Sequence, residues 1–304
     1  MTATPASTPE PSQLSPHRAE RVDLAGRYGP IAALREAAAD NADAARLAAT
    51  ALLVPGFTGS KEDFAPLLDP ISDAGIEVVA IDLPGQYESA GPGTETEYRP
   101  GPLGAALAEL IEKLAAEGRR VLLLGHSYGG LVARATVLAG APLAGLTLLD
   151  TGPAELPTGD RRTALDLGEA ALRERGMAAA QRLVEARDAI NPKWPGMAPE
   201  LKKLLRDRVL HSVPAGLLGM ADGLRYEPDL VTKLSRTLRS TRVPCLVLCG
   251  EADDAWSPAS QRDMAERLDA DFAVLPNAKH SPNTENPEAL LNTLLPTWRA
   301  WLTS

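Results

Sequence analysis

Short, mostly apolar runs alternate with longer amphipathic stretches along most of this chain. Runs of this length are typical of strands that are buried on both faces of a sheet. They lie at residues 50–54, 76–81, 121–124, 143–149, 243–250 and 271–275. Because helical stretches such as 101–116 separate them, successive strands are expected to run parallel. The pattern therefore predicts an α/β fold with a mostly parallel sheet.

The beginning and the middle of the chain depart from this alternation. Residues 1–19 are rich in Thr, Pro and Ser, so we expect a disordered tail there. No convincing strand separates the helical stretches at 161–175, 177–189 and 199–210. The expected organisation is a core formed by 20–150 and 241–304, with a helical cap at 151–240.

The pentapeptide Gly125-His126-Ser127-Tyr128-Gly129 lies where the apolar run 121–124 meets a helix-forming stretch. A strand that turns into a helix within one or two residues strains the central residue and exposes its side chain. Glycines two positions before and after keep the strand and the helix from colliding. Ser127 is therefore a candidate nucleophile. The amide of Tyr128, in the first helical turn, is a candidate donor to a developing anion.

Four histidines compete to activate this serine, because a serine hydroxyl is a poor nucleophile without a neighbouring base. His17 lies in the expected tail, and His211 belongs to the helical insertion. His126 precedes the serine on a strand, so its side chain is expected to point away from it. His280, in a loop after the last predicted strand, is the candidate that is left.

A histidine base needs a carboxylate at its second ring nitrogen, which holds its tautomer and stabilises its charge. The loop after residues 243–250 offers Asp253 and Asp254, in the order serine, acid, histidine. Asp150, at the end of the run 143–149, is a less favoured substitute. No His or Cys cluster has metal-ligand spacing, so neither a metal nor a cofactor is expected.

Taken together, the motifs resemble the α/β-hydrolase family. Those that carry the resemblance, in the family's order, are Pro55-Gly56-Phe57, Gly125-His126-Ser127-Tyr128-Gly129-Gly130, Gly250-Glu251-Ala252-Asp253 and His280. The resemblance covers residues of about 20 to 302. It implies an eight-stranded, mostly parallel sheet with a helical lid inserted after the sixth strand.

The resemblance also selects among the site residues. The family places its acid three residues after a glycine, which favours Asp253 as counted from Gly250. The loop that supplies the second oxyanion donor usually begins with His-Gly in this family, and here Pro55 replaces the histidine. The expected donor is the backbone N–H of Phe57, so the changed side chain should be tolerated. A serine at 127 argues against epoxide hydrolase and haloalkane dehalogenase chemistry, which use an aspartate there.

Composition excludes several classes of partner. The 304 residues are 44% hydrophobic, which is ample for a large core, and carry a net charge of −9. No nucleic-acid partner is expected, because a phosphate-binding surface needs a basic excess. No run of eighteen apolar residues occurs, so no membrane span is predicted. The oligomeric state is left open.

The start of the chain and the two cysteines bear on the compartment. Residues 1–19 lack the basic start and the apolar run of a secretory signal. Cys245 and Cys249 lie four positions apart in one predicted strand, too far apart for a disulfide. We therefore expect a cytoplasmic location.

The resemblance implies a serine hydrolase that acts on a carboxylic ester or related small-molecule acyl substrate. Ser127, His280 and Asp253 would form its triad and an acyl-enzyme its intermediate. The same residues also suit a thioesterase, a C–C hydrolase or a cofactor-free perhydrolase. A non-catalytic ligand-binding protein on the same fold is the alternative from a different class, and the intact triad argues against it.

Overall fold

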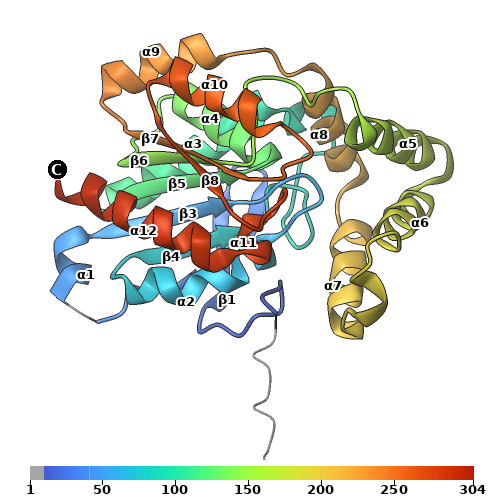
Figure 1. Ribbon diagram of the computed structural model, residues 1–304, viewed down its shortest axis with the longest axis horizontal. Helices are drawn as coiled ribbons and strands as arrows, with labels where there is room; N and C mark the ends of the chain where they lie inside the picture. Colours follow the sequence, from blue (N-terminus) through green and yellow to red (C-terminus); the bar gives the residue numbers. More distant parts are fainter. Residues whose placement is uncertain (1–9, 41) are drawn as a thin grey trace, which may run out of the picture.

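The computed structural model describes residues 10–40 and 42–304. An eight-stranded sheet with the order β1-β2-β4-β3-β5-β6-β7-β8 runs through the molecule (Figure 1). β1 pairs antiparallel with β2, and β2 pairs antiparallel with β4. The six strands that follow in the sheet order, β4, β3, β5, β6, β7 and β8, all pair parallel. The predicted mostly parallel, eight-stranded sheet is thus confirmed. The strands are β1 Glu20–Gly26, β2 Gly29–Glu36, β3 Ala49–Val54, β4 Glu77–Ile81, β5 Arg120–His126, β6 Gly145–Leu149, β7 Cys245–Gly250 and β8 Asp271–Leu275.

Two apolar cores lie on the two faces of this sheet. Along β5, Leu123 belongs to one core, while Leu122 and Leu124 belong to the other. Alternate side chains of a strand point to opposite faces, so a strand buried on both faces must be apolar throughout. The helices on the first face are α3 Pro100–Ala116, α4 Tyr128–Leu138, α9 Val231–Thr241 and α10 Pro258–Leu268. Those on the second are α1 Ala42–Leu47, α2 Ala65–Asp73 and α12 Pro287–Thr303.

The chain leaves the sheet after β6 and returns at β7, with only helices and loops between them. Four of these helices, here called the inserted helices, are α5 Asp160–Arg175, α6 Met177–Asp188, α7 Pro199–Leu210 and α8 Pro214–Tyr226. In Figure 1, α5, α6 and α7 stand to one side of the sheet. The fifth helix, α9, buries Val231, Leu234 and Leu238 in the core of the first face. The predicted cap at 151–240 therefore includes a helix that packs on the core.

Short helical turns complete the chain, and two of them flank the loops that matter for the site. They are η1 Lys61–Phe64, η2 Glu95–Tyr98, η3 Trp194–Gly196 and α11 Pro282–Glu285. In the part of the chain that the structure describes, no helix is long and apolar enough to cross a membrane. Cys245 and Cys249 are both buried and free.

The N-terminal segment corrects one expectation. Residues 1–9 of the predicted disordered tail 1–19 lie outside the described residues, but residues 10–19 are ordered against the core. The Gln13 side chain donates a hydrogen bond to Asp63 (3.0 Å), and Arg18 donates one to Glu36 (2.8 Å). His17 is half-buried rather than fully exposed. Composition alone missed this, because a few specific polar contacts hold the segment rather than an apolar face.

Candidate active site

The turn between β5 and α4 has the geometry that the pentapeptide predicted. Ser127 has φ 54° and ψ −119°, a region that a residue with a side chain rarely adopts, and α4 begins at the next residue. A Cβ atom at Gly125 would lie 2.3 Å from the carbonyl oxygen of Gly129, and one at Gly129 would lie 2.4 Å from that of Val54. The two glycines therefore allow strand, turn and helix to pack closely enough to present the serine.

Three side chains from the ends of three strands form one hydrogen-bonded chain. Ser127 follows β5, Asp253 follows β7 and His280 follows β8. The Nε2 atom of His280 is 2.9 Å from the Oγ atom of Ser127, and its Nδ1 atom is 2.8 Å from Oδ1 of Asp253. All three residues are buried, with exposed fractions of 7% to 8%. The geometry is that of a nucleophile, a base and an acid that orients the base.

Asp253 is held as a carboxylate. Burial alone would raise its pKa, but the hydrogen bond from His280 keeps the pKa below its usual value. The amide of Ala255 donates to Oδ1 (2.8 Å), and the side chain of Gln261 donates to Oδ2 (2.7 Å). These donors fix the carboxylate plane toward the imidazole.

The two other candidate acids do not bond to His280. Asp254 is exposed and pairs with Arg161 at 2.6 Å. Asp150 is fully buried, and its Oδ1 atom accepts a hydrogen bond from the Gly250 amide (2.8 Å). Burial and the adjacent Asp253 raise the pKa of Asp150 well above its usual value. The neutral form of Asp150 is thus favoured beside the charged Asp253.

One group of side chains has donor atoms close enough for a metal ion. Ligand atoms of Asp150, Asp253 and His280 all lie within 4.8 Å of one another. Both ring nitrogens of His280, however, already face Asp253 and Ser127, so neither is free to ligate an ion. The arrangement suits proton transfer better than metal binding.

His126 lies closer to the site than its place on the strand led us to expect. Its Nε2 atom donates to the backbone carbonyl of His280 (2.6 Å), and the two imidazole centroids are 5.3 Å apart. Burial, followed by the neighbouring His280, lowers the pKa of His126 to about 4, so this ring is neutral at physiological pH. His126 therefore braces the loop that carries His280 rather than acting as a base.

Two further aromatic residues take positions that the sequence did not settle. His211 is exposed and stacks on Tyr87, with ring centroids 6.1 Å apart. Trp256 is buried, 6.3 Å from the His280 ring, and donates to the Glu155 carbonyl (3.1 Å). Trp256 thus packs behind the histidine and does not line an open pocket.

The loop after β3 passes directly over the serine. A Cβ atom at Gly56 would lie 3.0 Å from Cβ and 3.4 Å from Oγ of Ser127, so a side chain here would crowd the serine. Phe57 follows, and among the described residues no backbone acceptor engages its N–H. Tyr128 is the first residue of α4, where amide groups have no partner within the helix. Of the two expected oxyanion donors, Phe57 therefore follows a residue that lies against Ser127, and Tyr128 follows Ser127 itself.

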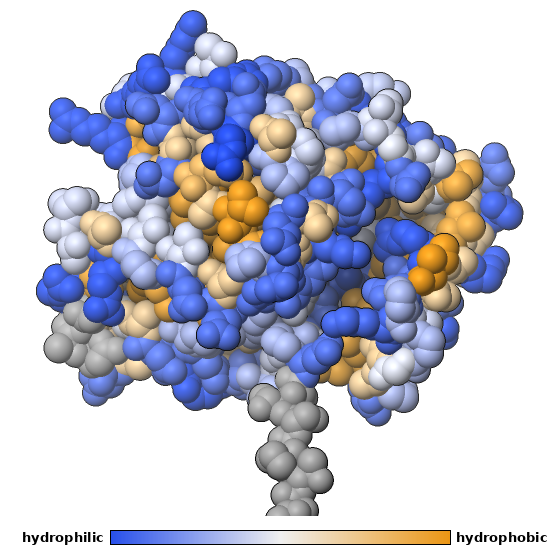
Figure 2. Space-filling view, in the orientation of Figure 1, coloured by the Kyte–Doolittle hydropathy of each residue, from blue (hydrophilic) through white to orange (hydrophobic). Residues whose placement is uncertain are grey.

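The inserted helices supply an apolar wall beside Phe57. Its half-buried ring packs against a cluster formed by Leu172, Met177, Ala180, Val209, Leu217 and Leu218. These residues come from α5, α6, α7 and α8. No sequence motif in these four helices indicated that they pack beside the loop that carries Phe57. Figure 2 shows polar side chains over most of the visible face, with apolar ones in several patches, one of them on the inserted helices at its right edge. Exposed apolar residues of α5 and α6 include Leu167 and Leu183.

A family comparison adds to this geometry. Residues 51–293 match the model described as "Alpha/beta hydrolase family", which covers most of the chain and all three triad positions. The chain belongs to the alpha/beta hydrolase family. The fold and the hydrolase class that the motifs implied are thereby confirmed.

Relatives of this alpha/beta hydrolase have several activities. It is 25% identical, over 244 residues, to the Bacillus subtilis (strain 168) protein "Putative 2-succinyl-6-hydroxy-2,4-cyclohexadiene-1-carboxylate synthase", covering 76% of this chain and 84% of that protein. A malate-bound thermophilic esterase from Thermogutta terrifontis is 25% identical with a TM-score of 0.69, covering 93% of this chain and 99% of that one. The enol-lactonase from Burkholderia xenovorans LB400 has a TM-score of 0.71 at 20% identity, over 93% of this chain and 100% of that one. This last likeness is one of fold.

Proposed function

We propose that this alpha/beta hydrolase is a serine hydrolase that cleaves carboxylic esters or related acyl substrates through an acyl-enzyme. The observation that carries the proposal is the buried chain from Ser127 through His280 to Asp253, with contacts of 2.9 Å and 2.8 Å. A histidine at hydrogen-bonding distance from a strained, presented serine is the arrangement that activates a hydroxyl.

In the acylation step, the Oγ atom of Ser127 attacks the acyl carbonyl carbon while Nε2 of His280 accepts the hydroxyl proton. Asp253 stabilises the imidazolium that forms. The amides of Phe57 and Tyr128 donate to the oxygen that becomes negative in the tetrahedral intermediate. When the intermediate collapses, the imidazolium gives its proton to the departing alcohol, and the acyl group stays on Ser127.

Deacylation repeats these roles with water as the nucleophile. His280 accepts a proton from water as the water oxygen attacks the acyl carbon, and the same two amides hold the second oxyanion. Collapse breaks the bond to Ser127, whose oxygen recovers a proton from His280. The carboxylic acid leaves, and the enzyme returns to its starting state.

The surroundings of Phe57 favour an apolar acyl group. The wall beside it is formed by leucine, valine, methionine and alanine side chains of the inserted helices. Such a wall binds a hydrocarbon by removing its surface from water, at roughly 25 cal/mol per Å². In this proposal the inserted helices act as the predicted cap, and they set the size of the acyl group.

The test is labelling with a fluorophosphonate probe, followed by intact-mass measurement. We expect a single adduct on the wild type and none on Ser127→Ala. A panel of ester, thioester and diketone substrates, with and without peroxide, then distinguishes esterase activity from the thioesterase, C–C hydrolase and perhydrolase alternatives. A well-folded wild type without an adduct would contradict the proposal and favour a ligand-binding protein.

A second candidate is the synthase activity named for the Bacillus subtilis relative, which the 25% identity over 244 residues favours. Its product carries two carboxylates, whereas the wall beside Phe57 is apolar, so we place it second. Formation of 2-succinyl-6-hydroxy-2,4-cyclohexadiene-1-carboxylate, followed by absorbance, tests this candidate directly. Turnover by the wild type that exceeds its best ester rate would reverse the ranking.

A further inference from the structure

Gln86 is a fully buried polar residue that the proposed mechanism does not use. It lies in the loop after β4, close to the loop after β3 that carries Phe57. Its Oε1 atom accepts a hydrogen bond from the Leu83 amide (3.2 Å), and its Nε2 atom donates to the carbonyl oxygen of Gly56 (2.8 Å). Nε2 is also 3.7 Å from the sulfur of Met220 on α8.

These partners fix which way the Gln86 amide faces. If the amide were rotated by half a turn, its oxygen would face the Gly56 carbonyl oxygen and its NH2 group would face the Leu83 N–H. Both contacts would then be repulsive in this buried site. Gln86 therefore presents a donor to Gly56.

The carbonyl of Gly56 and the N–H of Phe57 belong to the same peptide group. The described residues contain no cis peptide bond, and in a planar trans peptide the C=O and the N–H point in opposite directions. A donor that holds the carbonyl on one side therefore turns the N–H toward the other side. Since Gly56 contacts Ser127, fixing its carbonyl fixes the direction of the expected oxyanion donor.

A second donor holds the same carbonyl from within the loop. The Gly59 amide donates to the Gly56 carbonyl (3.0 Å), which closes a four-residue turn. The third residue of this turn, Thr58, has φ 58°, a region that β-branched residues rarely adopt. Rotation of the Gly56–Phe57 peptide would break both hydrogen bonds to this carbonyl and would turn the Phe57 N–H away from the serine.

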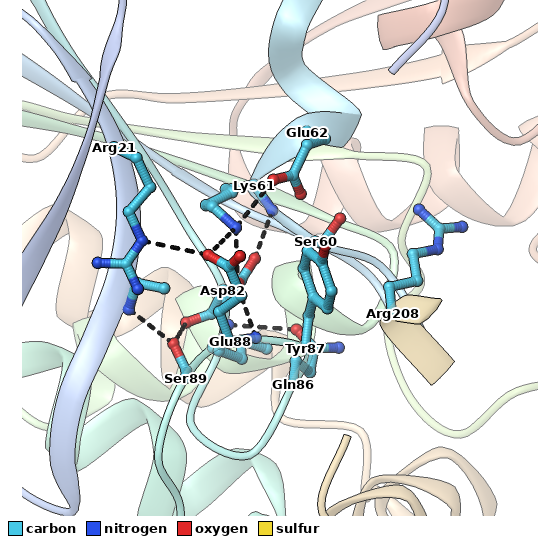
Figure 3. A network of polar contacts seen from close by, with 12 residues as sticks. Arg21, Ser60, Lys61, Glu62, Asp82, Gln86, Tyr87, Glu88, Ser89 and Arg208 are labelled. Carbon is cyan, nitrogen blue, oxygen red and sulfur yellow. Dashed lines mark hydrogen bonds and ion pairs between the residues drawn. The ribbon is translucent and has the colours of Figure 1, made fainter. Parts of the chain in front are cut away.

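A cluster of charges around the buried Lys61 joins the loop after β3 to the loop after β4 (Figure 3). The Lys61 amide donates to Asp82 (2.7 Å), and the Lys61 ammonium is 3.2 Å from Asp82 and 2.9 Å from Glu88. Lys61 ends the first loop, while Asp82 and Glu88 flank Gln86 in the second. Gln86 thus reaches Gly56 from a firmly held position.

We propose that Gln86 is a positioning residue for the oxyanion hole. Its side-chain amide holds the Gly56–Phe57 peptide so that the Phe57 N–H faces the acyl oxygen as that oxygen becomes negative. The inference rests on the proposed function, because it assigns a task at the same site. Gln86 touches neither the serine nor the substrate, and it acts through the peptide alone.

The test compares Gln86→Leu, which keeps the side-chain size but removes the donor, with the wild type. Two quantities are measured: kcat and KM for a p-nitrophenyl ester, and the inhibition constant of an alkylboronic acid, which forms a tetrahedral adduct with an activated serine. Removing one oxyanion donor costs about 10²–10³ in kcat, so misdirecting it should cost about 10- to 100-fold. Boronate affinity should fall in parallel, with KM changed much less.

A second variant separates positioning from packing. In Gln86→Glu, the ionised carboxylate would repel the Gly56 carbonyl, but the protonated acid can donate to it. The rate of this variant relative to the wild type should therefore rise as the pH is lowered, which loss of packing would not produce. Gln181→Leu, at a buried glutamine of α6, is the matched control and should leave both kcat and boronate affinity unchanged.

The outcomes separate the two claims. Undiminished boronate affinity and kcat in folded Gln86→Leu would overturn the inference alone, as would a rate of Gln86→Glu that does not depend on pH relative to the wild type. If Gln86→Leu does not fold, as thermal unfolding would show, Gln86→Glu decides. A wild type whose boronate binding is no stronger than that of Ser127→Ala would overturn the proposed function and the inference with it.

Discussion

Two buried aspartates beside His280 differ in charge, and the difference decides what each can do. Asp253 bonds to the imidazole and has a lowered pKa, while Asp150 lies behind it with a raised one. Two carboxylates in contact cannot both be ionised at low cost. In the proposed mechanism Asp253 therefore stabilises the imidazolium, and the raised pKa of Asp150 favours its neutral form.

This difference predicts that the same substitution, aspartate to asparagine, has a large effect on kcat at one position and a small one at the other. Asp253→Asn should lower kcat by about 10³–10⁴-fold, because the imidazole loses its orienting charge. Asp150→Asn replaces a neutral acid by a neutral amide and should stay within about tenfold of the wild type. Steady-state hydrolysis of one ester checks both. A larger loss for Asp150→Asn than for Asp253→Asn would exchange the two roles.

The lowered pKa of His126 should make the free energy of unfolding depend on pH. Its pKa of about 4 in the folded protein lies below the usual value near 6.5, so the unfolded chain binds more protons between these pH values. Its contribution to stability is present above pH 6.5 and is lost as the pH falls toward 4, up to about 3 kcal/mol. Urea unfolding across this range should show a smaller pH slope for His126→Asn. An unchanged slope would contradict the prediction.

The sequence located the candidate triad residues but not the residues that support them. Ser127, Asp253 and His280 could be singled out because each follows a predicted strand in a fixed order, and the structure brings them within hydrogen-bonding distance. His126 and Gln86 could not be placed, because their partners are backbone carbonyls of other loops. A backbone carbonyl carries no sequence signal, so such contacts appear only once the loops are positioned.

At the scale of elements, the loops after β3 and β4 depend on one buried cation. Lys61 is 1% exposed, and its ammonium is within 3.2 Å of Asp82, Glu62 and Glu88. Burial would lower the pKa of Lys61, but Asp82 and Glu62 raise it above its usual value, so the lysine stays charged. Burial raises the pKa of Asp82 to about 7, against the pull of Lys61.

Removing the positive charge of Lys61 should lower the stability of the folded protein. Lys61→Met leaves the buried carboxylate of Asp82 unpaired, and breaking a buried ion pair in this way costs about 3–5 kcal/mol. The free energy of unfolding, measured in urea, should fall by that amount. Lys193→Met is the matched control, since Lys193 and its partner Glu10 are 74% and 80% exposed, and it should have no measurable effect. Equal stabilities of the two variants would contradict the assignment.

Helix α8 lies within the predicted helical cap at 151–240, but the sequence did not give its bounds. It contains Gly216, Gly219 and Gly223, which lower helix propensity. The structure explains one of them: a Cβ atom at Gly219 would lie 1.9 Å from the Glu95 carbonyl oxygen. Close packing against η2 requires the glycine, and that packing in turn holds the helix. Tertiary contact therefore outweighs local propensity here.

At the scale of the molecule, the proposed cap is tied to the core near the serine. Ser127 is 8% exposed, and an ion pair joins α7 to the core next to the site. In that pair, Nη1 of Arg208 is 2.7 Å from Oδ1 of Asp63, and the two side chains are 15% and 10% exposed. In the proposed function, we expect a large substrate to reach the serine only when these helices move.

Weakening this link should therefore favour large reagents. Arg208→Ala should speed labelling by a bulky fluorophosphonate several-fold more than labelling by a small one, because only the bulky probe waits for the helices to open. Rates of adduct formation measured by mass give the ratio. Lys203→Ala, on the same helix and paired with Asp207 one turn away, should leave the ratio unchanged. A ratio unaltered by Arg208→Ala would contradict this role.

The sheet order also has a consequence for the life of the chain during synthesis. β6 and β7 are neighbours, with Leu146 opposite Cys245, although all of the inserted helices separate them in sequence. A ribosome therefore releases the serine long before the aspartate and the histidine are translated, and closing so long a connection is slow. Until the final two strands join, the serine is an ordinary hydroxyl without a base. A newly made chain thus acquires its reactivity only on completing its fold.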